Sequence, residues 1–266
     1  PYFGDGSKWG MQLKYAVEKE PLGTGGAIRN AAELIDLEAA KAAHEEFVIF
    51  NGDVLSHHSI AAQLDFHRKH QADVTLHLIS VEDARAFGCV PTDKDGRVTA
   101  FLEKMDNPVT NDINAGCYVF SPSVISEIPE GKVISIERET FPQLVKSGRP
   151  VFGYSEQSYW LDIGTPAALI TASQDLITKK LQSPATPEND GKALIAPDVT
   201  MGKSTKIAGG SVISKGVVIG ENCEIIGSII FAGAKIADNC RIINGIVAPN
   251  SQIAANTVAT SEIIGY

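Results

Sequence analysis

The C-terminal part of the chain repeats an aliphatic side chain at every sixth residue, and this period limits the possible folds more than any other feature. One step of six residues fits a short strand plus a turn, and three such steps close one coil of a parallel β-helix. An α-helix does not fit the period, and the Gly, Val, Ile and Thr that dominate the segment are weak helix formers. We therefore predict a left-handed parallel β-helix over residues 195–266. The repeat positions are Ile195, Met201, Ile207, Ile213, Ile219 and Ile225, then, after a five-residue step, Ile230, Ile236 and Ile242, and after another, Val247 and Ile253.

A second set of repeat positions lies four residues after the first. The aliphatic side chains of the first set are expected to point into the coil, and the second set to fit its tight interior. Gly and Asn between them supply left-handed backbone at the corners. Each coil buries its apolar face only against its neighbours, so several coils are needed. The second set is Val199, Thr205, Ser211, Val217, Cys223, Ile229, Ala234, Cys240, Ile246, Ser251 and Thr257.

Residues 183–194 form a polar, Pro-rich linker that separates the repeat from residues 1–182. In residues 1–182 the apolar patterns of strands and helices alternate, which predicts an α/β, Rossmann-like domain with a mostly parallel sheet covered by helices. Ligands of such sheets bind at the carboxyl ends of the strands. We predict strands at 11–17, 47–50 and 73–79, helices at 27–37 and 60–70, helix or loop at 38–45, and a hairpin turn at Gly96.

Composition excludes several classes of function. The formal net charge of -9 argues against a nonspecific nucleic-acid binder, which needs a basic face. No apolar run is long enough to span a bilayer and no signal peptide opens the chain, so we expect no membrane partner and a cytoplasmic location. The four cysteines form no CxxC pair and have no histidine at zinc spacing, which favours small buried hydrophobic roles.

Segments that follow predicted strands carry the candidate chemistry. Glu18–Ala27 is a Gly-rich turn into a helix, where a ligand can approach the backbone closely, although its spacing is neither that of a P-loop nor that of a dinucleotide-binding turn. Asn51–Asp53 places a carboxylate at a strand end, where it suits a divalent cation such as Mg²⁺ or forms an Asx turn. In the pair Glu103–Lys104, the lysine either neutralises a phosphate or forms a solvated charge pair with the glutamate.

Two further segments complete this series. Asn114–Tyr118 opens another strand, with a small residue where a ligand can lie close. Trp160–Pro166 precedes a helix, and its Asp162 is either a second metal ligand or the stabilising residue of a helix-entry turn. Taken in this order, the segments are far more specific than any one of them alone.

In this order the segments resemble the sugar-1-phosphate nucleotidyltransferases, most closely the mannose-1-phosphate guanylyltransferases (GDP-mannose pyrophosphorylases). Phe3–Ser7, Glu20–Ala27 and Ser135–Glu137 also match, and the resemblance covers nearly the whole chain, including the β-helix. It implies transfer of a nucleotidyl group from a nucleoside triphosphate, with GTP expected, to a sugar-1-phosphate, with mannose-1-phosphate expected. Mg²⁺ is the implied cofactor, and no protein nucleophile is needed.

The resemblance also implies roles for individual residues. Asp53 and Asp162 would hold Mg²⁺ and, together with Lys104 at the sugar phosphate, are the expected catalytic residues. The expected substrate-binding residues are Pro21, Leu22, Gly23 and Thr24 at the base, Glu103, Asn114 and Glu137 at the sugar, and Gly88 and Gly116 where the ligand needs room.

Two features depart from the family pattern. Met105 stands where the family has a proline after Glu-Lys. The N-terminal Gly-rich signature, with its catalytic Arg and a second Lys, is absent, so we expect the first domain to be N-terminally incomplete.

Other readings stay open at this point. A hexapeptide-repeat acyltransferase would need a histidine in a coil loop, but no histidine follows His77, so the β-helix is expected to be a scaffold or a surface for homo-oligomer formation. A non-catalytic subunit that binds a nucleotide sugar and a glucose-1-phosphate nucleotidyltransferase are the remaining alternatives.

His67 and His70 form a possible metal pair at helical spacing, while His57 and His58 are possible substrate contacts. For all four, solvated side chains are the preferred interpretation.

Overall fold

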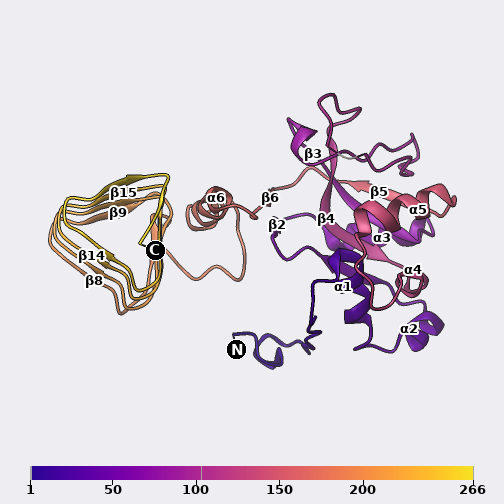
Figure 1. Ribbon diagram of the computed structural model, residues 1–266, viewed down its shortest axis with the longest axis horizontal. Coiled ribbons are helices and arrows are strands. Elements are labelled where there is room, and N and C mark those ends of the chain that lie inside the picture. The colour runs from indigo at the N-terminus through magenta and orange to yellow at the C-terminus, as the bar shows by residue number, and fades with distance from the viewer. Residues whose placement is uncertain (1, 103, 266) are drawn as a thin grey trace. The chain divides into compact units, whose positions relative to one another are not determined.

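The computed structural model describes residues 2–102 and 104–265, which divide into two compact units. The first unit runs to residue 52 and resumes over 57–160, and the second takes residues 53–56 and the chain from 161 onward. Figure 1 draws both units and labels many of their helices and strands. The division into a domain over residues 1–182, a linker over 183–194 and a β-helix over 195–266 stays a prediction.

The first unit is built on a four-stranded sheet in the order β1-β4-β3-β5. Strands β1, β3 and β5 run in one direction, because β4 is antiparallel to both β1 and β3 while β3 and β5 are parallel. Three of the four strands thus share one direction, as the predicted mostly parallel sheet requires, and β4 is the one reversed strand. The strands are β1 (Phe47–Phe50), β3 (Val74–Ser80), β4 (Asp112–Phe120) and β5 (Val151–Ser155).

Helices pack on both faces of this sheet, and the alternation of side chains along β3 shows how. Leu76 and Leu78 point to the face where Phe120 and Phe141 complete a fully buried core. Thr75 and His77 point to the other face, which α3 covers with polar side chains. The helices are α1 (Gly23–Ala32), α2 (Leu37–Ala43), α3 (Ile60–Lys69), α4 (Pro122–Glu127) and α5 (Phe141–Lys146), with short turns at Ser7–Trp9, Ala84–Ala86 and Ile136–Thr140.

Most of the predicted elements of the first unit are confirmed, and one is wrong. Strands lie at 47–50 and 74–80, α3 begins after the N-cap Ser59, and Gly96 turns a short hairpin with φ of +82°. The segment 38–45 folds as the helix α2. The predicted strand at 11–17 is not formed. Its apolar residues Met11 and Val17 are exposed, and a strand without a pairing partner is not stable.

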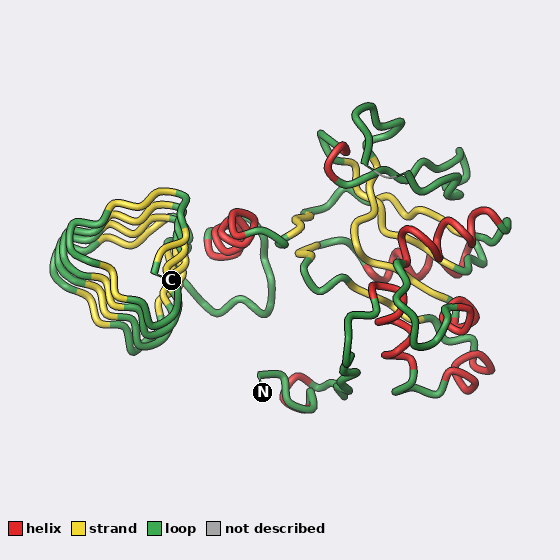
Figure 2. Tube along the Cα trace, viewed as in Figure 1, coloured by secondary structure: helices red, strands yellow, loops and turns green. Residues whose placement is uncertain are grey.

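The second unit contains a β-solenoid whose strands stack in three parallel sheets (Figure 2), consistent with the predicted left-handed β-helix. Val212 pairs with Leu194 on one side and with Ile229 on the other, so a coil takes eighteen residues at first and seventeen later. The strands are β7 (Ala193–Ile195), β8 (Thr200–Met201), β9 (Lys206–Ala208), β10 (Ser211–Ile213), β11 (Val218–Ile219), β12 (Glu224–Ile226), β13 (Ile229–Ile230), β14 (Lys235–Ile236), β15 (Arg241–Ile243), β16 (Ile246–Val247), β17 (Gln252–Ile253), β18 (Val258–Thr260) and β19 (Ile263–Ile264).

The interior of the solenoid follows the predicted pattern from its second coil onward. The repeat aliphatics from Ile213 to Ile253 are buried, and Cys223 and Cys240 fill small interior positions. Ile195 and Met201 pair in register with the buried Ile213 and Ile219, but they are 38% and 47% exposed because they lie on the first coil.

Two further repeat positions point out of the coil. Ile229 and Ile246 precede Ile230 and Val247, the aliphatics that follow the five-residue steps, so strand alternation turns their side chains outward. There they pack against Ile170 of α6 (Pro166–Ile177). The five-residue steps thus create the apolar stripe that holds this helix on the solenoid.

Polar contacts also fix α6 to the solenoid. Gln174 donates from Nε2 to the carbonyl of Gly227 at 2.9 Å and to Oδ1 of Asn244 at 3.0 Å. Thr165 caps the helix by accepting from the amide of Ala168. None of the helices within residues 2–102 and 104–265 is long and apolar enough to cross a bilayer.

Candidate functional site

The Gly-rich turn at the start of α1 is shaped by its packing against residues 132–134. The amide of Gly25 donates to the carbonyl of Ile134, and the amide of Ile134 donates to the carbonyl of Leu22, both at 2.9 Å. A Cβ on Gly23 would lie 2.6 Å from the Ile134 carbonyl oxygen, and one on Gly26 would lie 2.5 Å from that of Lys132. The glycines are therefore required by the chain itself, and they let α1 begin four residues earlier than predicted.

Thr24 of this turn contacts Glu137, although the two are far apart in sequence. The Thr24 hydroxyl donates to Oε2 of Glu137 at 2.8 Å and accepts from the amide of Ile136 at 2.9 Å. The Ser135 hydroxyl donates to the same carboxylate oxygen at 3.1 Å. The structure thus joins one predicted base contact with one predicted sugar contact. Of the other turn residues, Pro21 is exposed and Leu22 is half-buried.

Tyr118 connects this pair to Asn114 and was not singled out from the sequence. Asn114 donates from Nδ2 to the Tyr118 hydroxyl at 2.9 Å, and its Oδ1 accepts from the amide of Gly116 at 3.1 Å. Burial, and then the charge of Glu137, raise the pKa of Tyr118, so its hydroxyl stays protonated. A tyrosine inside an apolar strand needs a polar partner, and that signal could have found it.

The two glycines predicted to make room for a ligand lie in different settings. Gly116 has φ of +76°, and a Cβ there would lie 3.0 Å from Nδ2 of Asn51. Its carbonyl accepts from the amide of Asn51 at 2.8 Å. Gly88 is buried with φ of +78° and precedes Cys89, which packs in one cluster with Ala115. Both glycines therefore adopt backbone conformations in which a residue with a side chain would be strained.

Asp53 and Asp162 come together in the second unit, beside Gly164. Strands β2 (Val54–Ser56) and β6 (Trp160–Asp162) pair, and the amide of Ile163 donates to the carbonyl of Asp53 at 2.8 Å. A Cβ on Gly164 would lie 3.0 Å from Oδ1 of Asp162 and 3.8 Å from Oδ2 of Asp53. Both carboxylates are exposed and flank one point that glycine leaves open.

The two carboxylates suit an open site for a divalent cation better than a closed structural metal site. Mg²⁺ is usually bound by one or two carboxylates, and its other ligands are water and substrate phosphates. The described residues contain no group of three or more His, Cys, Asp or Glu side chains placed to hold a metal. The donor set therefore suits a hard cation that arrives with a phosphate ligand, and it does not suit structural zinc.

The histidines and the Glu-Lys segment add little to this arrangement. His67 is buried and contacts the Thr75 hydroxyl at 2.9 Å, so the expectation of a solvated helix histidine is wrong for it. His70 contacts the carbonyl of Phe66 at 2.9 Å, and neither ring belongs to a group of three or more potential metal ligands among the described residues. Lys104 is exposed, and no hydrogen bond or ion pair joins it to another described residue. Glu103 lies outside the described residues.

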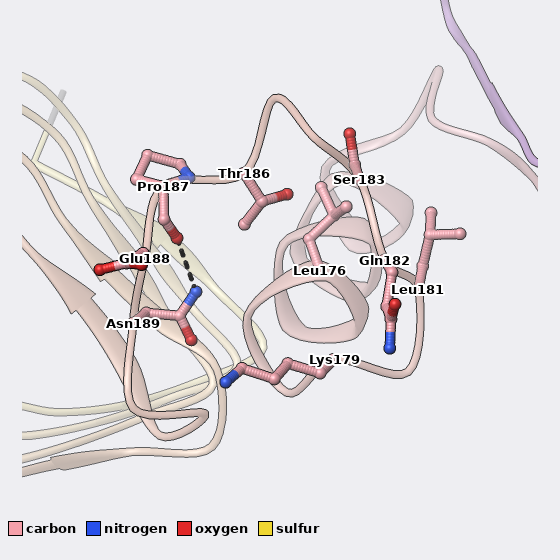
Figure 3. A pocket seen from close by; sticks show the side chains of 9 residues that line it. All are labelled: Leu176, Lys179, Leu181, Gln182, Ser183, Thr186, Pro187, Glu188 and Asn189. Carbon is pink, nitrogen blue, oxygen red and sulfur yellow. Dashed lines mark hydrogen bonds between the residues drawn. The ribbon is translucent and has the colours of Figure 1, made fainter.

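A hollow of about 370 Å³ opens between the end of α6 and the linker, but none of the predicted site residues lines it. Figure 3 shows its lining, which includes Lys179, Ser183 and Glu188. Asn189 donates from Nδ2 to the carbonyl of Pro187 at 2.9 Å, and this bond stabilises a turn within the linker. The hollow is a consequence of the linker path and does not form part of the candidate site.

Comparison with family models divides the chain in two. Residues 1–179 match the family model described as nucleotidyl transferase, and residues 189–265 match the one described as the GMPPB C-terminal domain. The solved structure of a Bacillus anthracis protein provisionally assigned as a glucose-1-phosphate thymidylyltransferase has a similar fold. It is 19% identical, with a TM-score of 0.55, over 64% of this chain and 68% of that one.

Two relatives are mannose-1-phosphate guanylyltransferases by name. A mannose-1-phosphate guanylyltransferase from Mycobacterium tuberculosis is 46% identical over 85% of this chain and 61% of its own length. The catalytic subunit beta of a mannose-1-phosphate guanylyltransferase from Drosophila pseudoobscura is 33% identical over 76% of this chain and 54% of its own. The chain thus spans little more than half the length of the relatives that it matches.

Proposed function

The chain belongs to the nucleotidyl transferase family, and we propose that the protein transfers a guanylyl group from GTP to mannose-1-phosphate. The observation that carries this proposal is the pairing of Asp53 and Asp162 beside Gly164. Two carboxylates at one open point suit a phosphate-bound divalent cation, which this reaction requires. The activity for which the relatives at 46% and 33% identity are named supports guanine as the base and mannose as the sugar.

The proposed reaction is a direct displacement at phosphorus. A phosphate oxygen of mannose-1-phosphate attacks the α-phosphorus of GTP, and the bond to the β-phosphate oxygen breaks with its electron pair leaving on pyrophosphate. No protein nucleophile takes part, so catalysis consists of positioning and charge neutralisation. Asp53 and Asp162 would hold Mg²⁺, which supplies positive charge to the phosphates when bound. The exposed Lys104 is proposed to contact the sugar phosphate.

The polar network of the first unit is proposed to hold the organic parts of the substrates. Thr24 and the turn before it would contact the base, while Asn114 and Glu137 would contact sugar hydroxyls. A carboxylate has about four lone-pair sites. Glu137 uses Oε2 for both Thr24 and Ser135, so it retains acceptor capacity for a ligand. Glu103, Gly88 and Gly116 stay proposed substrate neighbours.

The experiment that tests this proposal is an assay of pyrophosphate release by the protein as its gene encodes it. Mannose-1-phosphate and Mg²⁺ are supplied with GTP, ATP, UTP or TTP in turn, and glucose-1-phosphate then replaces the mannose compound. Release with GTP and mannose-1-phosphate alone would support the proposal. Release with another pair would reassign the base or the sugar, and no release with any pair would contradict the proposal.

Self-association through the solenoid is a separate prediction, which light scattering at working concentration would test.

Removal of the Tyr118 hydroxyl should weaken sugar-phosphate binding. Tyr118→Phe keeps the buried ring but leaves Asn114 without the acceptor at 2.9 Å. We expect the KM for mannose-1-phosphate to rise about fivefold with the KM for GTP unchanged, because one hydrogen bond that orients a ligand contact is lost. Steady-state kinetics at saturating GTP measure this change.

Tyr154→Phe is the matched control. The Tyr154 hydroxyl donates to Oε2 of Glu156 at 2.6 Å, away from Asn114 and Glu137, so its loss should leave both KM values unchanged. Equal effects of the two substitutions would show that the Tyr118 hydroxyl has no special role.

A further inference from the structure

Strand β4 carries a bulge directly beside the predicted sugar contacts. Leu76 pairs with Tyr118 and Leu78 pairs with Asn114, so a single residue of β3 faces three residues of β4. The bulge holds Ala115, Gly116 and Cys117, and Gly116 adopts its positive φ there. A β-bulge next to a functional site changes the direction of nearby side chains, but it leaves backbone groups without the regular hydrogen bonds between strands. The conformation of Asn114 and Gly116 therefore depends on what secures the bulge.

The side chain that secures it is Gln63 of α3, which is 0% exposed. Its Nε2 donates to the carbonyl of Thr75 on β3 at 3.1 Å and to that of Cys117 on β4 at 3.4 Å. Its Oε1 accepts from the Cys117 thiol at 3.4 Å. Burial raises the pKa of that thiol to about 12, so the thiol keeps its proton and can donate.

His58 completes the contacts of this amide. Its Nε2 lies 2.9 Å from Oε1 of Gln63, and because a carbonyl oxygen only accepts, the proton sits on Nε2. The His58 ring stacks on that of His77, with centroids 3.9 Å apart, and His77 is the residue of β3 that faces the bulge. Gln63 thus joins α3, β3, β4 and the segment before α3 at one point.

We propose that Gln63 is a positioning residue that holds the β4 bulge and so sets Asn114 and Gly116 for the sugar phosphate. A buried primary amide on a helix face costs free energy unless all its groups are bonded, and here both ends of the amide are used. An apolar side chain would fill the same space without this cost, so the bonds are the reason for glutamine. The proposal rests on the proposed function, because it names the sugar-phosphate side of that reaction.

The test replaces Gln63 with methionine, which keeps the length of the side chain but cannot hydrogen-bond the strands. In the protein as its gene encodes it, Gln63→Met should raise the KM for mannose-1-phosphate about tenfold and change kcat and the KM for GTP less than about twofold. The matched control is Thr75→Val, which removes the bond to His67 at the same interface, also fully buried. Thr75→Val should lower the melting temperature comparably without raising that KM.

Amide hydrogen exchange of the segment 112–118, followed by mass spectrometry, separates this inference from the proposed function. Faster exchange in Gln63→Met but not in Thr75→Val would support the role in holding the bulge, even if the parent protein shows no turnover and the proposed function fails. If the parent is active and the two variants match in both KM and exchange, Gln63 has only a structural role and the inference is wrong.

Discussion

Replacement of Asp162 by asparagine should lower kcat by about a hundredfold to a thousandfold while the fold stays intact. The two carboxylates flank one point beside Gly164, and loss of one charge halves the anionic field that would hold a cation there. Asparagine keeps the oxygen that accepts from the Gly164 amide at 2.8 Å, so the turn into α6 should persist. Initial rates across a Mg²⁺ titration measure the effect, and more Mg²⁺ should be needed for half-maximal rate.

Asp190→Asn is the control for this substitution. Asp190 is exposed and accepts from the amide of Lys192 at 2.8 Å, the same two-residue turn that Asp162 makes with Gly164. We expect Asp190→Asn to leave the rate and its Mg²⁺ dependence unchanged. Retention of more than about a tenth of the parent rate by Asp162→Asn, with the same Mg²⁺ dependence, would show that Asp162 only shapes the turn.

Acid should destabilise the first unit through His77. Burial lowers the pKa of this 0% exposed ring to about 4, and the charge of the stacked His58 acts in the same direction. In the unfolded chain the ring titrates near its ordinary value of 6.5. Between these two values the unfolded state binds a proton that the folded state does not, so the free energy of unfolding falls as pH falls. The stabilisation is complete above about pH 6.5 and is lost toward pH 4, by about 3 kcal/mol.

Urea unfolding followed by tryptophan fluorescence measures this loss. Both tryptophans, Trp9 and Trp160, belong to the first unit, so the fluorescence follows the unfolding of that unit. His77→Phe keeps an aromatic ring against His58 but cannot titrate, and it should remove most of the difference between about pH 7 and pH 4.5. His57→Gln, at an exposed neighbour, should leave the difference in place. An unchanged pH dependence in His77→Phe would mean that other groups cause it.

Local patterns predicted much of the fold. The six-residue period determined the solenoid because each coil depends on short-range spacing and on an identical neighbour. The buried run Phe47–Phe50 and the amphipathic helix after Ser59 were found for the same reason. The outward direction of Ile229 and Ile246 was missed, because each directly precedes an inward-pointing aliphatic residue, and strand alternation then turns its own side chain out of the coil.

The candidate site was predictable as a set of segments but not as a set of contacts. Motif resemblance selected Asp53 and Asp162, yet their approach beside Gly164 depends on the pairing of β2 with β6. Gln63 and Tyr118 escaped notice because their partners are set by the register shift between β3 and β4. No sequence period announces such a bulge, since it breaks the very alternation that identifies a strand.

The most direct test of the proposed transfer is to measure both products of the reaction at once. The protein as its gene encodes it is incubated with GTP, mannose-1-phosphate and Mg²⁺, and the nucleotide sugar and pyrophosphate are quantified by chromatography. We expect equal amounts of the two products, and neither when mannose-1-phosphate is omitted, because the sugar phosphate is the attacking group. Pyrophosphate without nucleotide sugar, or no product at all while the nucleotide sugar still binds, would contradict direct transfer and favour a binding protein.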